Sequence, residues 1–206
     1  MPPMDNRQSD QTRRRLLDAA FAEIHRHGFQ AASLAKILAD TGLTKGALYH
    51  HFPDKKSLGL AVVDEIIGKR LAEQYVEPFA TAEHPVQALL RVLREKAGQS
   101  EDSLKLGCPL NNLMQEMSPV DEAFRIRLRR ILVAWQGAFE AALVHAQTAG
   151  ELRREVDCRA AAMFIVAAWE GCVGIAKNLQ SAEGFADCMA QLQDYVASLL
   201  VDAGTS

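Results

Sequence analysis

The sequence predicts an all-α protein, in which a three-helix N-terminal head precedes a helical-bundle body, with about nine helices in all. Apolar residues recur at spacings of three and four along most of the chain, and no alternating run or internal repeat is present. Capping residues and glycine or proline stops divide the chain into segments of helical length. We expect the head to comprise residues 1–56 and the body residues 57–206.

Charge separates the same two regions. The 206 residues are 49% hydrophobic, which is enough to bury a core. The net charge of −3 hides an asymmetry, because residues 1–60 hold nine Lys and Arg against six Asp and Glu, whereas the remainder is acidic. A basic head on an acidic body fits a head that binds nucleic acid, although a surplus of three charges is a modest signal.

The cysteines and the N-terminus indicate the cellular compartment. Cys108, Cys158, Cys172 and Cys188 stand far apart, with no CxxC motif and no paired histidine spacing. We therefore expect neither a metal site nor a disulfide framework, no cofactor, and a reducing cytoplasm. No apolar run follows the basic residues near the N-terminus, so we expect no secretory signal.

Three helices are predicted in the head. The first ends at Gly28, and Ser33 caps a second, short helix that ends at Thr41 and Gly42. The third begins near Thr44 and stops before Pro53, because the residue before a proline avoids the helical region. The apolar face of the first helix comprises Leu16, Leu17, Ala20, Phe21 and Ile24.

The body begins with a long helix capped by Asp54. A second long helix is expected to start at Ser118-Pro119, where serine can cap and proline suits the first helical position. Asp157 opens a third, whose apolar residues 160–176 are fewer than the ~20 needed to cross a membrane and include Glu170. We expect this segment to be a buried helix and the protein to have no membrane partner.

The last helix carries a heptad seam. Its residues are Phe185, Cys188, Leu192, Tyr195 and Leu199, widened by Met189, Val196 and Leu200. We expect the last two helices of each subunit to form a four-helix homodimer interface. The alternative is that both helices pack only within the monomer.

The segment from Ser33 to Leu58 has the spacing of a helix-turn-helix. Leu34, Ile37 and Leu38 would pack its first helix, and Gly42 permits the tight turn. Exposed donors then lie at or near the start of the second helix, where base edges and phosphates are reached in the major groove. These donors are Thr44, Lys45, Tyr49 and His50, with Gly46 allowing close backbone approach and Lys55 and Lys56 placed to meet phosphate.

This segment resembles the TetR family of regulators. The matching pattern is a small hydroxyl residue, an apolar run, Gly-x-Thr-Lys-Gly, Leu-Tyr-x-His-Phe and a following Lys. The resemblance implies a homodimer that reads a near-palindromic operator in double-stranded DNA and represses transcription until a ligand changes the spacing of its recognition helices. By the same resemblance, the DNA contacts are Ser33, Thr44, Lys45, Gly46, Tyr49, His50 and Lys55.

The segment from Gly107 to Pro119 resembles one that precedes the pocket-lining helix in a subgroup of these regulators. It is therefore the candidate site for an unknown small-molecule effector, with methionines as adaptable walls and amides as hydrogen-bonding groups. The candidate residues are Cys108, Asn111, Asn112, Met114, Gln115, Met117, Trp135, Phe139, Phe164 and Trp169. Each of the four aromatic residues has plain core packing as its alternative.

Cys108 offers a second mechanism, because a thiol at a helix N-terminus has a lowered pKa. Some relatives sense electrophiles or oxidants through a cysteine in this region, so thiol modification is an alternative trigger; a small buried residue is the other interpretation. Two further alternatives are an enzyme that pairs Cys108 with His145, and a DNA-binding protein without an effector. Nothing in the sequence places a base, an orienting acid and an oxyanion hole together, so we expect no enzyme.

Overall fold

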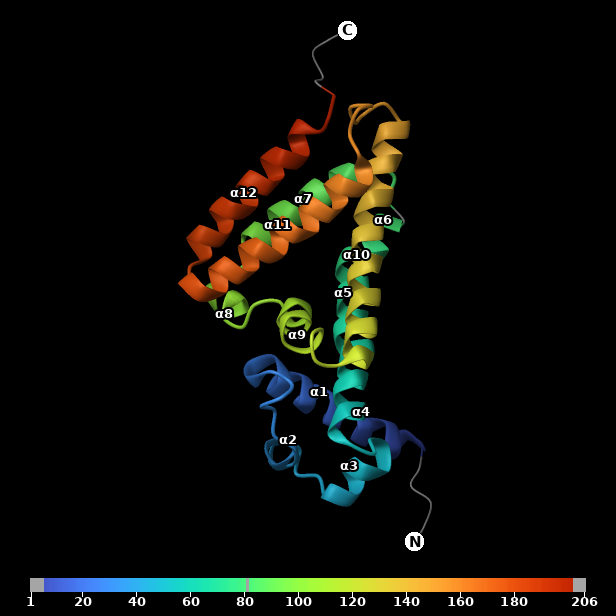
Figure 1. Cartoon of the computed structure of the whole chain (residues 1–206), viewed down its shortest axis with the longest axis vertical. Helices are drawn as coiled ribbons and strands as arrows, with labels where there is room; N and C mark the ends of the chain where they lie inside the picture. Colours follow the sequence, from blue (N-terminus) through green and yellow to red (C-terminus); the bar gives the residue numbers. More distant parts are fainter. Residues whose placement is uncertain (1–5, 81, 202–206) are drawn as a thin grey trace. The chain divides into compact units, whose positions relative to one another are not determined.

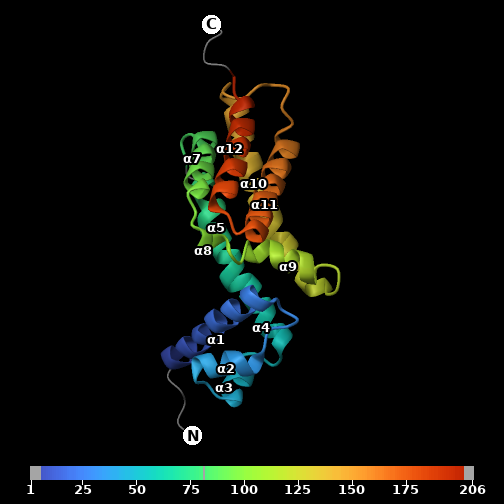
Figure 2. The same cartoon turned by 90° about the vertical axis from the view of Figure 1, so that its left-hand side faces the viewer.

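The computed structural model describes residues 6–80 and 82–201. The expected all-α class is confirmed (Figures 1 and 2), and in this part of the chain the one β-type pairing is an isolated bridge between Leu152 and Leu200. The helices are α1 (Asn6–His27), α2 (Leu34–Thr41), α3 (Lys45–His51), α4 (Lys55–Val62), α5 (Lys69–Tyr75), α6 (Glu77–Ala80), α7 (Pro85–Ala97), α8 (Glu101–Leu104), α9 (Pro109–Met117), α10 (Glu122–Thr148), α11 (Cys158–Leu179) and α12 (Ala182–Ser198). A π-helical stretch, η1 (Val63–Gly68), joins α4 to α5.

Contacts divide the chain into two compact units. The first unit contains residues 1–70 and 109–129, and the second contains residues 71–108 and 130–206. This grouping differs from the sequence-based boundary after residue 56, because α4, η1, α9 and the start of α10 belong with the head.

The first unit packs around α1 and α4. The apolar face predicted for α1 is inside, with Leu16 fully buried and Ile24 5% exposed. Phe29 packs against Phe124 with ring centroids 4.6 Å apart, and a Cβ at Gly59 would lie 2.4 Å from the Phe29 ring. Glycine is therefore required at position 59 for α4 to approach the turn after α1.

In the second unit, α12 packs against α7 and α11 (Figure 2). Its core is aromatic, because Trp135 and Phe139 on α10 are both buried. The backbone of Val201 donates to Glu151, and that of Arg153 donates to Leu199, so the residues after α12 are fastened to the loop after α10.

The seam predicted for dimerisation is the monomer core. Phe185, Leu192 and Leu199 are 1%, 4% and 6% exposed, and they are buried within one chain where α12 packs against α7 and α11. Tyr195 contacts Phe164 of α11. The assignment of this seam to a dimer interface is therefore wrong, because a neighbour within the monomer already covers it.

The cysteine spacing implied no disulfide framework, and the structure corrects this with one bond, which joins Cys172 on α11 to Cys188 on α12. Cys172 stands eight residues before Gln180 and Cys188 eight residues after it, and Gln180 ends α11 in a left-handed conformation. The symmetry about this turn brings the two thiols opposite each other in a helical hairpin. The spacing of 16 residues matches no disulfide motif, so the bond could not be predicted from the spacing.

Two local expectations also change. The cap of α10 is Asp121, which accepts hydrogen bonds from the backbone N–H groups of Ala123 and Phe124, and Ser118-Pro119 forms the turn before it. At 22 residues, α11 is the one helix in the described ranges that is long and apolar enough to span a membrane, but half of its most apolar window is buried. That burial is typical of a core helix.

Candidate nucleic-acid interface

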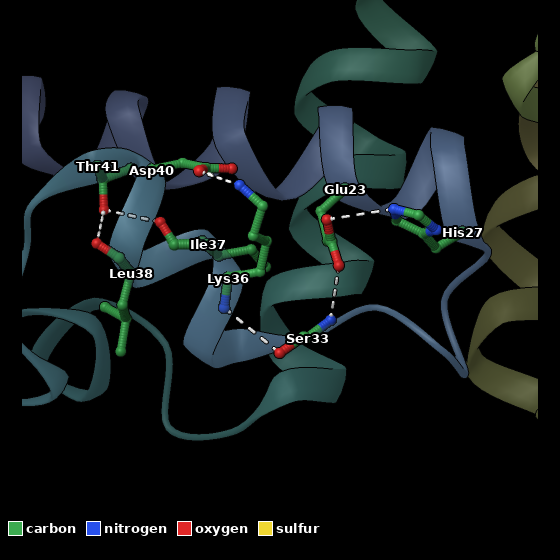
Figure 3. Close-up of polar contacts among 8 residues, drawn as sticks. All are labelled: Glu23, His27, Ser33, Lys36, Ile37, Leu38, Asp40 and Thr41. Atoms are coloured by element: carbon green, nitrogen blue, oxygen red, sulfur yellow. Dashed lines mark hydrogen bonds and ion pairs between the residues drawn. The ribbon is translucent and has the colours of Figure 1, made fainter.

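Hydrogen bonds hold both ends of α2 (Figure 3). The hydroxyl of Ser33 caps α2 by accepting from Lys36 N–H, and the carboxylate of Glu23 accepts from Ser33 N–H at 3.0 Å. At the other end of α2, the Thr41 hydroxyl donates to the carbonyl of Ile37. Gly42 then takes the left-handed conformation, with a φ of 65°, that the tight turn requires.

The short helix α3 has one buried and one exposed side. Thr44 caps it by accepting from Ala47 N–H, and Leu48 is 1% exposed and fastens the helix to the core. Lys45 and His50 are exposed, and Tyr49 keeps 51% of its surface accessible. Together these residues present an ammonium, a phenol and an imidazole on a helix that is small enough to enter a major groove.

Gly46 lies on the exposed side of α3 without a structural need for glycine. Its backbone is helical, and a Cβ built there would meet nothing closer than the Thr44 hydroxyl at 3.8 Å, an ordinary contact. A helix interior disfavours glycine by ~1 kcal/mol relative to alanine. The position is therefore better explained by something outside the monomer that approaches the α3 backbone.

The two lysines at the start of α4 are held by the protein itself. The Lys55 ammonium donates to the carbonyl of Gln30 at 2.9 Å and lies 5.1 Å from the centre of the Phe29 ring. The Lys56 ammonium pairs with Asp121 at 2.6 Å. A phosphate contact through either side chain has to compete with these partners, whereas the backbone N–H groups at the start of α4 remain suited to phosphate.

Arg13 and Arg15 of α1 are also engaged within the first unit. Arg13 forms a bidentate pair with Glu65 and lies over the Phe52 ring, and Arg15 donates to the carbonyl of Thr41. Hydrogen bonding from Arg13 lowers the pKa of Glu65. Burial lowers the pKa of His51 at the end of α3, and the charges of His50 and Arg13 act in the same direction. Arg13 thus lies over the residue that ends α3, and Arg15 is bonded to the residue that ends α2.

Two acidic residues that hold the backbone beside this interface were not predicted from the sequence. Glu23 is 9% exposed and holds the start of α2, and Glu116 on α9 accepts hydrogen bonds from the backbone N–H groups of Phe29 and Gln30. Both carboxylates bind backbone amides across the turn between α1 and α2. The sequence carries no signal for the second of them, since Glu116 lies 87 residues beyond Phe29.

The candidate effector residues fall into both units. Asn111, Asn112, Met114, Gln115 and Met117 lie on α9 in the first unit, whereas Cys108, Trp135, Phe139, Phe164 and Trp169 lie in the second. The Gln115 amide donates to Asn111 along the exposed side of α9. Phe164 does not join the other aromatic residues: it is 51% exposed and, with Tyr195 and Leu199, lines an open pocket of about 430 Å³.

The remaining aromatic residues form a buried cluster in the second unit. Tyr75, which sequence reasoning missed, stacks on Trp135 at 4.9 Å between ring centroids, and Trp169 meets both rings edge-on. Glu170 was not predicted as a site residue either. It is 7% exposed, and burial raises its pKa to about 7. A carboxyl group inside an aromatic core is the most unusual chemical feature of this unit.

Comparisons with known proteins match both parts of the chain. The family described as "Bacterial regulatory proteins, tetR family" matches residues 16–62, and "Tetracyclin repressor-like, C-terminal domain" matches residues 85–192. The first match contains α2, α3 and α4, and the second runs from the start of α7 into α12. The helix-turn-helix head thus matches the model for tetR-family regulatory proteins, and the helical body matches the model for the C-terminal domain of such repressors.

Individual relatives cover most of the chain. It is 27% identical over 153 residues to the HTH-type transcriptional repressor DhaR of Mycobacterium sp. (strain GP1), covering 71% of this chain and 72% of that protein. It is also 27% identical over 165 residues to the transcriptional regulator AcuR of Cereibacter sphaeroides, covering 79% and 74%. The crystal structure of a TetR transcriptional regulator from Chloroflexus aurantiacus superposes with a TM-score of 0.83 at 29% identity, covering 94% and 98%.

Proposed function

Because this chain belongs to the TetR family of bacterial transcriptional regulators, we propose that it binds double-stranded operator DNA as a homodimer and represses transcription until a small molecule releases it. Such regulators are typically not enzymes and typically act in the cytoplasm, and we extend both properties to this chain. The main support for this proposal is the exposed side of α3. There Lys45, Tyr49 and His50 are presented while Leu48 holds the helix to the core.

For the DNA contacts, we assign different roles to different residues. Tyr49 and His50 point away from the core and are the candidates for base edges, whereas Thr44 and Ser33 present helix N-termini to phosphates. Lys45 adds a cation beside them. We assign two roles to Lys55. Its ammonium positions the turn after α1 by donating to the Gln30 carbonyl, and it contacts a DNA phosphate.

The homodimer interface that we propose uses α11 and α12, but not the heptad seam. On α11, the exposed residues Met163, Phe164 and Ile175 are 51%, 51% and 57% accessible. Gly171 and Gly174 lie exposed between them, and a Cβ at either would meet no atom within 4 Å. An uncharged helix face with two glycines lets a second copy of the same helix approach closely. On α12 the corresponding exposed residues are small, at Ala190 and Ala197.

We place the effector in the second unit, around the aromatic cluster of Tyr75, Trp135 and Trp169. The cluster contains buried polar groups, which orient ligands in small-molecule sites. Thiol modification at Cys108 is less favoured, because no second cysteine lies near it in sequence to resolve an oxidised form. A Cys108→Ala variant that still responds to effector would exclude a thiol trigger.

The test is binding of the purified protein to DNA flanking its own gene, measured by fluorescence anisotropy across a salt series with scrambled competitor. Tyr49→Ala and Tyr49→Phe are compared with the wild type, so that the ring and the hydroxyl are separated. Specific binding that is lost in Tyr49→Ala supports the proposal. Binding that ignores sequence and falls steeply with salt would reduce the protein to a general electrostatic DNA binder without an operator.

A further inference from the structure

Glu170 has a buried carboxylate that the described part of the protein does not satisfy. It lies in the middle of α11 and is 7% exposed, and neither of its oxygens has a nitrogen or oxygen hydrogen-bond donor among the described residues. Burial, the larger cause, raises the pKa of Glu170, and a side-chain hydrogen bond from the Cys108 thiol, a weak donor, acts in the opposite direction. Buried carboxylates are almost always paired, because an unpaired one loses its hydration without compensation.

The groups around Glu170 are aromatic. Tyr75 is close enough for the charges of Cys108 and Glu170 to raise its pKa, in addition to the larger effect of burial. Tyr75 in turn contacts Trp135 and Trp169, whose own ring centroids are 5.7 Å apart. The indole N–H of Trp135 is also buried without an acceptor among the described residues. One cluster therefore holds a carboxyl group that meets no nitrogen or oxygen donor and an indole N–H that meets no acceptor among the described residues.

A basic residue near the cluster does not neutralise Glu170. The Lys96 ammonium lies 5.4 Å from the centre of the Tyr75 ring and donates to the amide oxygen of Gln74. Burial lowers the pKa of Lys96, so this cation is already partly desolvated beside the cluster. The aromatic rings thus accept a cation at one edge, as the negative faces of such rings favour.

We propose that Glu170 is the anionic anchor of the effector site, and that the effector is a small organic cation that carries N–H donors on an aromatic or apolar body. The ammonium donates to the Glu170 carboxylate, and the body contacts Tyr75, Trp135 and Trp169. This inference rests on the proposed function, because it names the chemical class of the molecule that releases the DNA. An ammonium supplies the counter-charge that an ionised carboxylate needs inside the core, and a neutral ligand does not, so a cation is favoured.

Binding at this site acts directly on the proposed dimer helix. The three aromatic residues are 7%, 1% and 4% exposed, so a ligand that reaches Glu170 has to part them. Glu170 and Trp169 lie on α11 immediately before Gly171, which belongs to the exposed face assigned to the dimer. A ligand with higher affinity for the parted cluster therefore shifts α11, and with it the spacing of the two subunits.

The two tryptophans of the chain both belong to this cluster, so intrinsic fluorescence reports on it specifically. The probes are phenethylamine, which is a cation with N–H donors, and 2-phenylethanol, its neutral counterpart. Each is titrated into the wild type, into Glu170→Gln, and into Glu183→Gln, which removes an exposed carboxylate from α12 of the same unit. Glu170→Gln replaces the buried carboxyl group with a neutral amide of nearly the same size, so the variant should fold.

We expect saturable quenching by phenethylamine in the wild type and in Glu183→Gln, and an affinity at least about tenfold weaker in Glu170→Gln. The affinity for 2-phenylethanol should be lower and should not depend on residue 170. The inference is overturned if phenethylamine gives no saturable change up to about 10 mM, or binds Glu170→Gln as tightly as the wild type. Equal affinity of the wild type for the amine and the alcohol would also overturn it.

The two proposals fail separately. DNA binding that is normal in the wild type and in Glu170→Gln, with no response of either protein to the amine, would refute the cation while leaving the regulator in place. Absence of specific DNA binding would refute the regulator, whatever the fluorescence titration shows. Amine-dependent loss of DNA binding in the wild type, but not in Glu170→Gln, supports both.

Discussion

The carboxylate of Glu116 on α9 accepts a hydrogen bond of 2.8 Å from the backbone N–H of Phe29, 87 residues earlier in the chain. Its other oxygen accepts from Gln30 N–H at the same distance. The turn that connects α1 to the DNA-binding helices is thus held by a residue that lies far from the head in sequence. Within the first unit, α9 is therefore placed to influence the helix-turn-helix.

Glu116→Gln should weaken this attachment, because an amide has one accepting oxygen where the carboxylate has two, and it carries no charge. We expect the free energy of unfolding to fall by about 1–3 kcal/mol, the range for charge-assisted hydrogen bonds. Urea denaturation measures the loss, and hydrogen exchange at Phe29 and Gln30 locates it. Glu77→Gln, which removes an exposed carboxylate in α6, is the control. Unchanged exchange at both amides would show that the contact is dispensable.

Gly46→Ala should separate folding from DNA binding. The added methyl group fits the monomer, so we expect the free energy of unfolding to rise by up to ~1 kcal/mol, as helix propensity predicts. Affinity for the operator should fall at least about tenfold, because the methyl group stands where DNA approaches the backbone. Gly137→Ala is the matched control: this exposed glycine of α10 also has no atom near its Cβ position. Full operator affinity in Gly46→Ala would contradict the close approach.

Gly174→Glu should disrupt the dimer and leave the monomer fold intact. Nothing in the chain lies within 4 Å of a Cβ at this position, whereas a partner helix packed on the proposed face would bury the new charge. We expect the dissociation constant of the dimer to rise at least about a hundredfold, because an unpaired buried charge costs several kcal/mol. Sedimentation equilibrium measures it, with Gly137→Glu as the control. A dimer that tolerates Gly174→Glu places the interface elsewhere.

Charged substitutions in the former dimer seam should behave differently. Leu192 is 4% exposed within the monomer, so Leu192→Glu should unfold the second unit rather than yield folded monomers. Circular dichroism distinguishes the two results.

The stability of the protein should fall with rising pH because of Glu170. Burial raises its folded-state pKa from 4.5 to about 7, so the folded state binds the proton more tightly than the unfolded state. The favourable contribution is complete below pH 4.5 and is lost as pH rises through about 7, a difference of ~3 kcal/mol. Glu170→Gln should remove this contribution, so that the variant is more stable than the wild type at pH 8. A wild type equal in stability to Glu170→Gln at both pH 5 and pH 8 would argue against the buried carboxyl.

The bond between Cys172 and Cys188 should stabilise the second unit. It closes a loop with a sequence separation of 16 residues, for which the chain-entropy estimate is ~3 kcal/mol. Alanine at both positions, or reduction of the wild type, should lower the free energy of unfolding by about that amount. Reductant should not affect the double variant further, because Cys108 and Cys158 carry thiols that are not in a disulfide. Equal stability of the oxidised and reduced wild type would show that the bond constrains nothing.

Local features of this protein followed from its sequence. The caps Ser33, Thr44, Asp54 and Asp157 all accept from backbone N–H groups three residues ahead, as their residue types predicted. A cap depends on atoms within one helical turn, so the residues themselves specify it. The same is true of the helix-turn-helix, where the spacing of Gly42 and Leu48 is a property of one short segment.

Tertiary structure decided which groups those helices bring together. The stripe from Phe185 to Leu199 was correctly identified as apolar, but periodicity does not say whether a neighbour in the same chain or a second subunit covers it. The pairing of Cys172 with Cys188 and the contact of Glu116 with Phe29 likewise join distant segments. The unmatched carboxylate of Glu170 became evident only once Tyr75, Trp135 and Trp169 were seen around it, because burial depends on the packing of several helices at once.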